Sequence, residues 1–175
     1  MRRRCEIALV QSAQFFHSLW QHASLNAAMI ALARYGLLIS FVVMLAALAR
    51  ARSAALLLWL GGGALLAAAL TYAAGRMLFD PRPFTVLPVT PLVAHAADNG
   101  FPSDHSSVAA FIAAAVWFVD ARLALVASLA ALAIGFARAY CFLHWPADVL
   151  AGWCIGALPA VLAGYGWRRH VTVAA

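Results

Sequence analysis

Lysine is absent from this sequence, and charged residues of every kind are scarce. They make up 10% of the 175 residues, whereas a soluble domain carries about 25%. Hydrophobic residues make up 66%, and the mean hydropathy is +0.89. A soluble domain of this size would have too little polar surface to cover itself. The composition therefore excludes an ordinary soluble protein and predicts an integral membrane protein, because lipid tails accept an apolar exterior.

Cysteine and acidic residues are also few. The three cysteines, Cys5, Cys141 and Cys154, show no CxxC or other metal-binding spacing, so they are read as small hydrophobes. Twelve arginines against six acidic residues give a net charge of +6. The arginines lie at the ends of apolar runs and form no continuous basic stripe, so no nucleic-acid partner is expected. Anionic lipid headgroups are the expected partners of this charge.

Five apolar runs follow the amino-terminal region, at residues 27–48, 54–74, 108–119, 123–136 and 147–167. The third run is short for a span unless its helix starts near Ser103. The pattern predicts an all-α integral membrane bundle of about five transmembrane helices, in a single membrane-embedded domain over residues 1–175. Residues 1–25 combine three arginines, a short apolar stretch and aromatics such as Phe16 and Trp20. A signal peptide is the alternative there, but an interfacial amphipathic helix is favoured.

The longest polar interruption, residues 75–104, holds five of the seven prolines and cannot be a continuous helix. The order of the runs places this loop and the link around His144 on one face of the membrane. The links at residues 50–52 and 120–122 and the carboxyl terminus lie on the other face. The positive-inside rule makes this second face cytoplasmic. Arg2, Arg3 and Arg4 conflict with that assignment, because five spans place them on the first face.

Three polar clusters gather on the face of the long loop. They are residues 76–84, residues 101–106, and Arg138 with His144 and Asp148. Arginine guanidinium groups suit phosphate oxygens, and the helix start at Ser103 attracts anions. A carboxylate four residues after a histidine can hold one imidazole nitrogen and leave the other facing the anion. One histidine can then attack phosphorus while a second protonates the leaving oxygen.

These clusters resemble the three signatures of the type 2 phosphatidic acid phosphatase (PAP2) superfamily. The signatures are Arg82-Pro83, then Pro102-Ser103-Asp104-His105, then Arg138 followed by His144 and Asp148. The resemblance implies that His144 is the nucleophile and forms a phosphohistidine, that Asp148 orients it, and that His105 is the general acid. It also implies that Arg82, Arg138 and Ser103 bind phosphate, with no metal and no cofactor. The site is expected to include Arg76 and Asp104 as further phosphate-binding residues.

Three positions depart from the family pattern. Gly75 stands where members usually carry lysine, and the adjacent Arg76 is the candidate substitute. Ala137 stands where many members have serine, and Asp104 replaces a more frequent glycine. Pro-Ser-Asp-His and Arg-Pro-Phe resemble the branch of bacterial undecaprenyl-diphosphate phosphatases.

The expected function is metal-independent hydrolysis of undecaprenyl diphosphate in a bacterial inner membrane, at an active site facing the periplasm or cell exterior. One alternative is a phosphatidylglycerophosphate or other lipid phosphatase. Another is a non-catalytic lipid-binding or transport protein. In the long loop, His95 and Asp98 are read as solvated residues, and Asp80 as a turn residue before Pro81.

Overall fold

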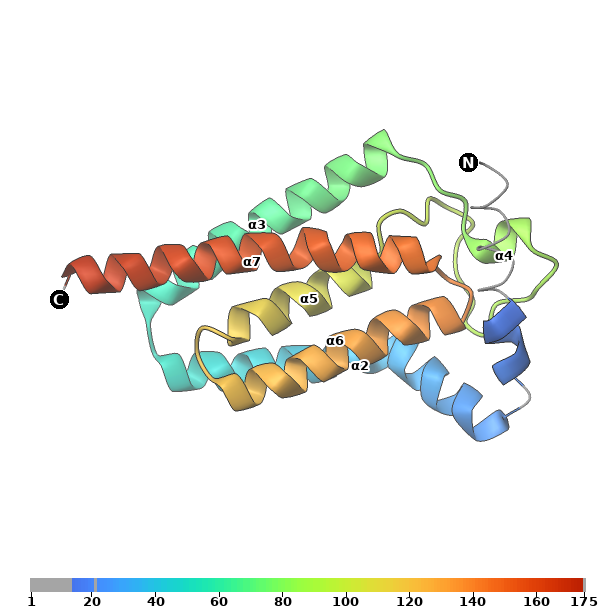
Figure 1. Cartoon of the computed structure of the whole chain (residues 1–175), viewed down its shortest axis with the longest axis horizontal. Coiled ribbons are helices and arrows are strands. Elements are labelled where there is room, and N and C mark those ends of the chain that lie inside the picture. Colours follow the sequence, from blue (N-terminus) through green and yellow to red (C-terminus); the bar gives the residue numbers. More distant parts are fainter. Residues whose placement is uncertain (1–13, 21, 175) are drawn as a thin grey trace.

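The computed structural model describes residues 14–20 and 22–174 as a helix bundle (Figure 1). Its helices are α2 (Ala23–Ala51), α3 (Ala54–Met77), α4 (Pro83–Val86), α5 (Asp104–Val116), α6 (Ala121–Tyr140) and α7 (Pro146–Ala174). Within that part of the chain no strand occurs, and the sole bridge joins Pro81 and Asn99. The all-α prediction is confirmed, and each predicted apolar run falls largely within one helix.

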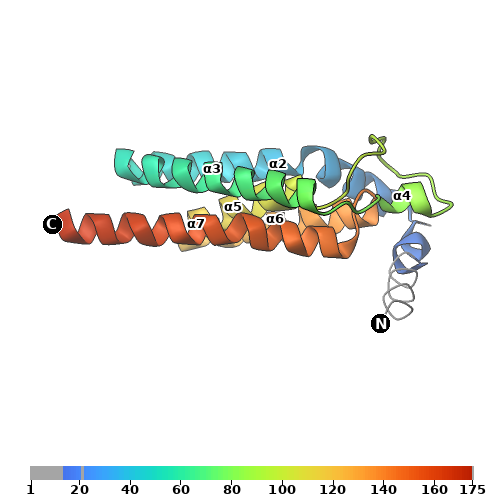
Figure 2. The ribbon, with the colours of Figure 1, turned by 90° about the horizontal axis from the view of Figure 1, so that it is seen from above.

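Four of these helices, α2, α3, α6 and α7, are long and apolar enough to cross a membrane. Large apolar side chains on their outer faces are exposed, among them Leu38, Leu58 and Leu129, as expected where lipid is the solvent. Helix α5 has 13 residues and therefore extends only about 20 Å. Figure 1 shows it between α6 and α7, and Figure 2 shows these three helices on one side of the bundle with α2 and α3 on the other. The chain is thus a multi-pass membrane protein with a short, central α5.

The helix links lie at the two ends of the bundle as the order of runs predicts. The α2–α3 link, the α5–α6 link and the carboxyl terminus share one end, and the long loop with α4 occupies the other (Figure 1). Arg50 Nε, at the end of α2, is 3.7 Å from the carboxylate of Asp120, which caps α6. This ion pair joins the two links directly.

The described part of the amino-terminal region packs on the loop end of the bundle. Residues 14–19 are helical, and Trp20 Nε1 donates to the carbonyl of Tyr140 at 3.1 Å. The Tyr140 hydroxyl donates to Asn26 Oδ1 at 2.6 Å. The predicted interfacial helix over residues 1–25 is therefore helical and docked where it is described, and residues 1–13 and 21 lie outside the described residues.

Helices α5 and α7 approach each other through glycine. Gly152 and Gly156 are one turn apart on α7 and face the first two turns of α5. A Cβ at Gly152 would lie 2.6 Å from the Ser103 carbonyl oxygen, and one at Gly156 only 1.9 Å from that of Ser107. Small residues allow such close backbone contact in membrane bundles. The contact fixes the start of α5 against α7.

We expect Gly156→Ala to destabilise the fold by about 1–3 kcal/mol, because the added methyl group forces α5 and α7 apart. Thermal unfolding of the detergent-solubilised protein measures the change. Gly62→Ala is the matched control, since a Cβ there meets nothing within 4 Å and alanine favours helix over glycine. Equal melting temperatures for the two variants would contradict the close α5–α7 contact.

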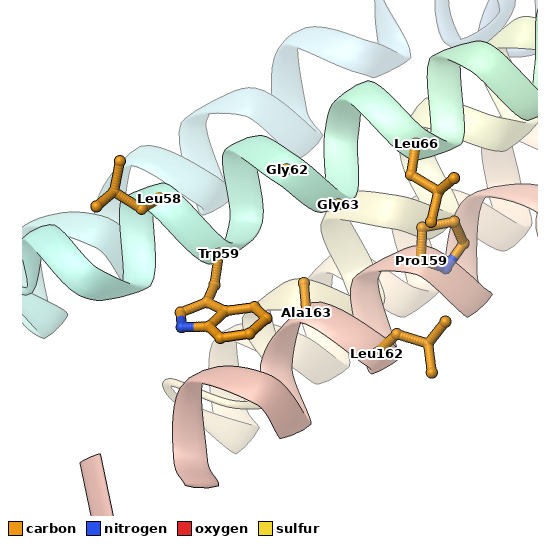
Figure 3. A pocket seen from close by; sticks show the side chains of 8 residues that line it. All are labelled: Leu58, Trp59, Gly62, Gly63, Leu66, Pro159, Leu162 and Ala163. Carbon is orange, nitrogen blue, oxygen red and sulfur yellow. The ribbon is translucent and has the colours of Figure 1, made fainter. Parts of the chain in front are cut away.

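An apolar groove of about 400 Å³ lies between α3 and α7 (Figure 3). Leu58, Trp59 and Leu66 line it from α3, and Pro159 and Leu162 from α7. The Trp59 ring packs over the Gly166 position of α7, where a Cβ would lie 2.4 Å from it. The groove carries no charged lining residue, which suits a surface covered by lipid tails.

Candidate active site

Asn99 ties the long loop to the end of α3. Its side-chain Nδ2 donates to the carbonyl oxygens of Gly75 at 2.7 Å and Leu78 at 2.8 Å. Its Oδ1 accepts from the backbone N–H groups of Asp80 at 2.9 Å and Phe101 at 3.0 Å. All four hydrogen-bonding positions of the amide are used. The Asn99 side chain therefore joins the start of the loop, at residues 75–80, to its end at Phe101.

Ser103 begins α5 as the sequence predicts. Its Oγ accepts from the Ser106 backbone N–H and from the Ser106 hydroxyl, and it is fully buried. The Ser103 backbone N–H donates to the carbonyl of Asp148 at 3.1 Å. The helix start thus lies beside the first turns of α7, recessed within the end of the bundle.

His144 occupies the centre of the site, in the link between α6 and α7. Its Nδ1 is 2.8 Å from the carbonyl oxygen of Gly100. A carbonyl only accepts, so Nδ1 carries the proton and donates. The opposite nitrogen, Nε2, lies 3.2 Å from Arg82 Nη1 and 3.2 Å from Arg138 Nη2. The Nε2 lone pair therefore faces two guanidinium groups.

The protonation state of His144 follows from this setting. Burial, followed by the charges of Arg138 and Arg82, lowers the pKa of the imidazole to about 3. The ring is neutral at neutral pH, so Nε2 keeps the lone pair that a nucleophile requires. An anion entering between the two arginines would meet an uncharged imidazole.

Arg82 is held at every nitrogen. Nε donates to Asp98 Oδ1 at 2.6 Å, Nη1 to the Leu143 carbonyl at 2.8 Å, and Nη2 to the Asn99 carbonyl at 3.2 Å. The side chain of Arg82 is 6% exposed, whereas that of Asp98 is 59% exposed. These contacts orient the guanidinium plane, with one nitrogen also against His144.

Arg138 approaches His144 from the last turn of α6. It is 4% exposed, and its Nη1 donates to the Ala33 carbonyl of α2 at 3.4 Å. Its Nε is buried and has no hydrogen-bond partner among the described residues. A buried guanidinium donor without a partner is costly. An anion bound between Arg138 and Arg82 would remove part of that cost.

Asp148 lies on the Nδ1 side of His144. It is fully buried, and its Oδ2 accepts from the Trp145 backbone N–H at 2.8 Å. The same oxygen is 3.8 Å from His144 Nδ1. The structure therefore places the carboxylate of Asp148 beside the imidazole. The direct hydrogen bond of His144 Nδ1, however, goes to the Gly100 carbonyl and not to Asp148.

The remaining predicted residues lie around this centre. His105 is half-buried in the first turn of α5, close enough to Arg138 and His144 for their charges to act on it. Arg76 and Asp104 are exposed and line the same cleft as Arg82. The structure thus brings Arg82, Arg138, His144 and Asp148 together, and places Arg76 and Asp104 at the rim.

The glycine at position 75 has a local explanation. A Cβ there would lie 3.1 Å from the Phe101 carbonyl oxygen, which is tighter than ordinary contact. The loop therefore packs closely on the end of α3, where family members usually carry lysine. Arg76, one residue on, points to the cleft that Gly75 also lines.

Three contributors were missed by reasoning from the sequence. Gly100 contributes a backbone carbonyl, which leaves no signal in residue type. Asn99 shapes the loop. Asp98 was read as a solvated loop residue; its side chain is 59% exposed, but that reading missed its ion pair with Arg82. The sequence does place an acidic residue in the same loop as Arg82, which could have predicted this ion pair.

A cleft of about 1020 Å³ opens between α2, α3 and α5 and reaches the site. Arg76, Arg82 and Asp104 line its polar end. Its remaining length is largely apolar, with Phe41, Met44, Leu48, Leu57, Leu60, Ala64, Ala68 and Phe111 among the lining residues. Figure 1 shows α2 and α3 diverging from their link toward the loop end. The cleft therefore joins a cationic end to an apolar groove at the depth of the membrane.

Comparison with protein families gives one match, which covers most of the chain. The model of the PAP2 superfamily matches residues 56–170. This range holds all the residues predicted for the site.

Individual relatives are similar over different lengths. Undecaprenyl-diphosphatase BcrC from Bacillus subtilis (strain 168) is 29% identical over 156 residues, which are 87% of this chain and 79% of that protein. A lipid A 1-phosphatase from Rhizobium etli is 39% identical over 82 residues, 46% of this chain and 34% of that protein. Among solved structures, a transmembrane PAP2 type phosphatidylglycerolphosphate phosphatase from Bacillus subtilis superposes with a TM-score of 0.71. It shares 20% identity, and the superposition covers 96% of this chain and 88% of that one.

Proposed function

Because the chain belongs to the PAP2 superfamily, we propose that it is a membrane lipid phosphatase that hydrolyses undecaprenyl diphosphate to undecaprenyl phosphate. The observation that carries the proposal is the position of His144 Nε2. It faces the buried Arg82 and Arg138, and Arg82 also lines the polar end of a long, largely apolar cleft. A phosphate between the arginines would meet the nucleophile while its lipid chain follows the cleft.

The reaction has two steps. His144 Nε2 attacks the terminal phosphorus, a phosphohistidine forms, and the bridging P–O bond breaks. The leaving group is the lipid monophosphate, whose bridging oxygen takes a proton from the imidazolium form of His105. Burial lowers the pKa of this side chain to about 4, and the bound diphosphate anion raises it. Water then attacks the phosphohistidine, gives its proton to His105, and releases inorganic phosphate. Arg82 and Arg138 stabilise the negative charge on the equatorial oxygens in both steps.

The Nδ1 side of the imidazole supports the charge changes. Phosphorylation at Nε2 makes the ring cationic while Nδ1 keeps its proton. The Gly100 carbonyl then accepts a stronger hydrogen bond, and the Asp148 carboxylate, 3.8 Å away, stabilises the cation. Ser103, Arg76 and Asp104 are proposed to contact the remaining phosphate groups at the start of α5 and the rim of the cleft.

Two features favour a polyprenyl diphosphate among lipid phosphates. The cleft is long, apolar and open between α2 and α3, which suits one extended chain. Arg76, at the rim, adds a third cation beyond Arg82 and Arg138, which suits a second phosphate. The similarity to undecaprenyl-diphosphatase BcrC over 87% of this chain supports the same substrate.

Phosphate release from the detergent-solubilised protein tests the proposal. The substrates are undecaprenyl diphosphate, phosphatidic acid and phosphatidylglycerophosphate, with EDTA present throughout. We expect the highest kcat/KM for the diphosphate. A higher kcat/KM for either glycerolipid would contradict the proposed substrate. Absence of phosphate release from all three lipids would contradict the proposed phosphatase activity.

We expect Ala64→Phe to raise the KM for undecaprenyl diphosphate about tenfold, or about 1.4 kcal/mol, because the ring narrows the cleft. A short-chain prenyl diphosphate, which does not fill the cleft, should be hydrolysed as by the wild type. Ala69→Phe is the matched control, since Ala69 is exposed on the same helix outside both apolar grooves. Equal KM values for the two phenylalanine variants would contradict the role of the cleft.

The proposed setting is a bacterial inner membrane with the site at its outer face. The support is the charge at the opposite end of the bundle, where Arg50, Arg122, Arg168 and Arg169 are exposed. A cysteine at Thr90, which is exposed in the long loop, should react with an impermeant maleimide added outside intact cells. One at Arg169 should react only after the membrane is permeabilised, and the reverse pattern would overturn the orientation.

A further inference from the structure

Three consecutive glycines, Gly61, Gly62 and Gly63, lie within α3, where glycine weakens a helix relative to alanine. Packing explains Gly63, because a Cβ there would lie 2.9 Å from the Cβ of Ala163 on α7. A Cβ at Gly61 or at Gly62 would meet nothing within 4 Å. Gly62 lines the apolar groove between α3 and α7 (Figure 3), whereas Gly61 lines the cleft that reaches Arg82. The open space at Gly61 therefore belongs to this cleft.

The level of Gly61 in the cleft follows from the arrangement of α2 and α3. The two helices run in opposite directions from a two-residue link (Figure 1), so residues equally far from the link lie at about the same level. By this count Met44 lies opposite Gly61, and Leu48 lies opposite Leu57. All four residues line the cleft, and Leu48 and Leu57 are its lining residues nearest the link. The cleft is therefore open at Gly61 and has a floor of two leucines beyond it.

The length of the cleft can be compared with that of a prenyl chain. Its lining residues on α3 extend from Arg76, at the polar end, to Leu57 at the floor. These residues are 19 positions apart in one helix, a distance of about 28 Å, and Gly61 lies about 22 Å from the level of Arg76. An extended isoprene unit adds four main-chain carbon–carbon bonds of about 1.5 Å each, and thus about 5 Å of length. The fifth unit of a chain therefore reaches Gly61, whereas a three-unit chain ends before it.

Contact with the walls, and not transfer out of water, is what the cleft offers this chain. Lipid tails are as apolar as the lining residues, so the chain gains little hydrophobic free energy by leaving the bilayer. The cleft adds van der Waals contact on several sides, with Met44 of α2 and with Phe111 and Ile112 of α5. A side chain at position 61 would occupy this space and exclude the prenyl chain from it.

We propose that Gly61 is a specificity-determining residue of the phosphatase, because its missing side chain lets the cleft hold about the first five isoprene units of a polyprenyl chain. The later units leave the cleft between α2 and α3 and lie in the bilayer. The enzyme then distinguishes chains shorter than this length from longer ones, but does not distinguish longer chains from one another. This inference rests on the hydrolysis of a polyprenyl diphosphate proposed above.

Gly61→Leu and Gly62→Leu test it as a matched pair. Both replace an exposed glycine of α3 by a better helix former at a position where a Cβ meets no atom within 4 Å. We expect Gly61→Leu to raise the KM for undecaprenyl diphosphate about fivefold, because contacts with the walls are lost, and to leave the KM for a three-unit prenyl diphosphate unchanged. Gly62→Leu should change neither value. The same change in KM for both substrates in Gly61→Leu, or for undecaprenyl diphosphate in both variants, would overturn the proposal.

Photo-crosslinking in lipid nanodiscs tests the same inference without turnover. The probes are undecaprenyl bisphosphonates, in which a methylene group replaces the bridging oxygen, with a diazirine on the fifth or on the last isoprene unit. The fifth-unit probe should label peptides that contain Met44 or Leu57, and Gly61→Leu should reduce this label, whereas the last-unit probe should label lipid.

Equal labelling of these peptides by the two probes, or no labelling by the fifth-unit probe, would overturn the inference about Gly61. Absence of phosphate release from undecaprenyl diphosphate by the wild type would instead contradict the proposed function. The two failures are therefore distinguishable.

Discussion

His144→Ala should abolish phosphate release, with kcat reduced by at least about 10⁴-fold. The lone pair of Nε2 faces the two arginines, and burial and these charges hold the pKa of the imidazole at about 3. Within the described residues, no other histidine contacts both guanidinium groups. Phosphate release from undecaprenyl diphosphate measures the loss.

The control for this variant is His170→Ala. His170 is exposed near the carboxyl end of α7, at the opposite end of the bundle. This variant should keep wild-type activity. A second measurement traps the intermediate: wild type incubated with labelled diphosphate and quenched in alkali should retain label on protein, since phosphohistidine survives base. Label retained in His144→Ala would assign the nucleophile elsewhere.

Because His144 is neutral, it adds no charge to the site, and the charge of the pocket is set by the residues around the imidazole. Two arginines against a neutral imidazole leave the pocket cationic, and Asp98 is a carboxylate in direct contact with one of them, Arg82. Such a pocket favours a dianionic phosphate over the neutral lipid headgroups that surround it. The same charges that lower the pKa of His144 therefore also select the substrate group.

Residue types and spacing were sufficient to predict the main site residues. Arg82, Arg138, His144 and Asp148 stand at signature spacings, and Pro102-Ser103 marks the start of a helix. The structure places Ser103 at that helix start. The positions of these residues could be predicted because signature spacings and local helix rules depend on residue type, whereas their roles in catalysis stay predictions.

The residues that hold His144 and the long loop in position could not be predicted in the same way. Gly100 acts through a backbone carbonyl, and Asn99 acts through the path of a loop with five prolines within residues 75–104. That path depends on contacts with α3 and α7 that have no local pattern. The position of the start of α5 has the same origin, because it packs against Gly152 and Gly156 of α7.

Arg82→Lys should lower kcat/KM about 10²- to 10³-fold, although it keeps the charge. The guanidinium donates at once to Asp98, Leu143 and Asn99 while it faces His144. A lysine ammonium is a single point and cannot reproduce this plane. Inhibition by vanadate, a mimic of five-coordinate phosphorus, should weaken in parallel. Arg169 is exposed at the far end of α7, so the control variant Arg169→Lys should keep the kcat/KM of the wild type.

The pairing with Asp98 makes this prediction sharper. If Asp98 acts by orienting the Arg82 plane, Asp98→Asn alone should reduce kcat/KM, but should change little in the Arg82→Lys background, because the plane is already lost. The two effects are then non-additive, as expected for residues that act as a unit. Fully additive effects would mean that Asp98 acts on the substrate through its own charge. Asp98 is 59% exposed, so its variants should fold as the wild type does and report on orientation alone.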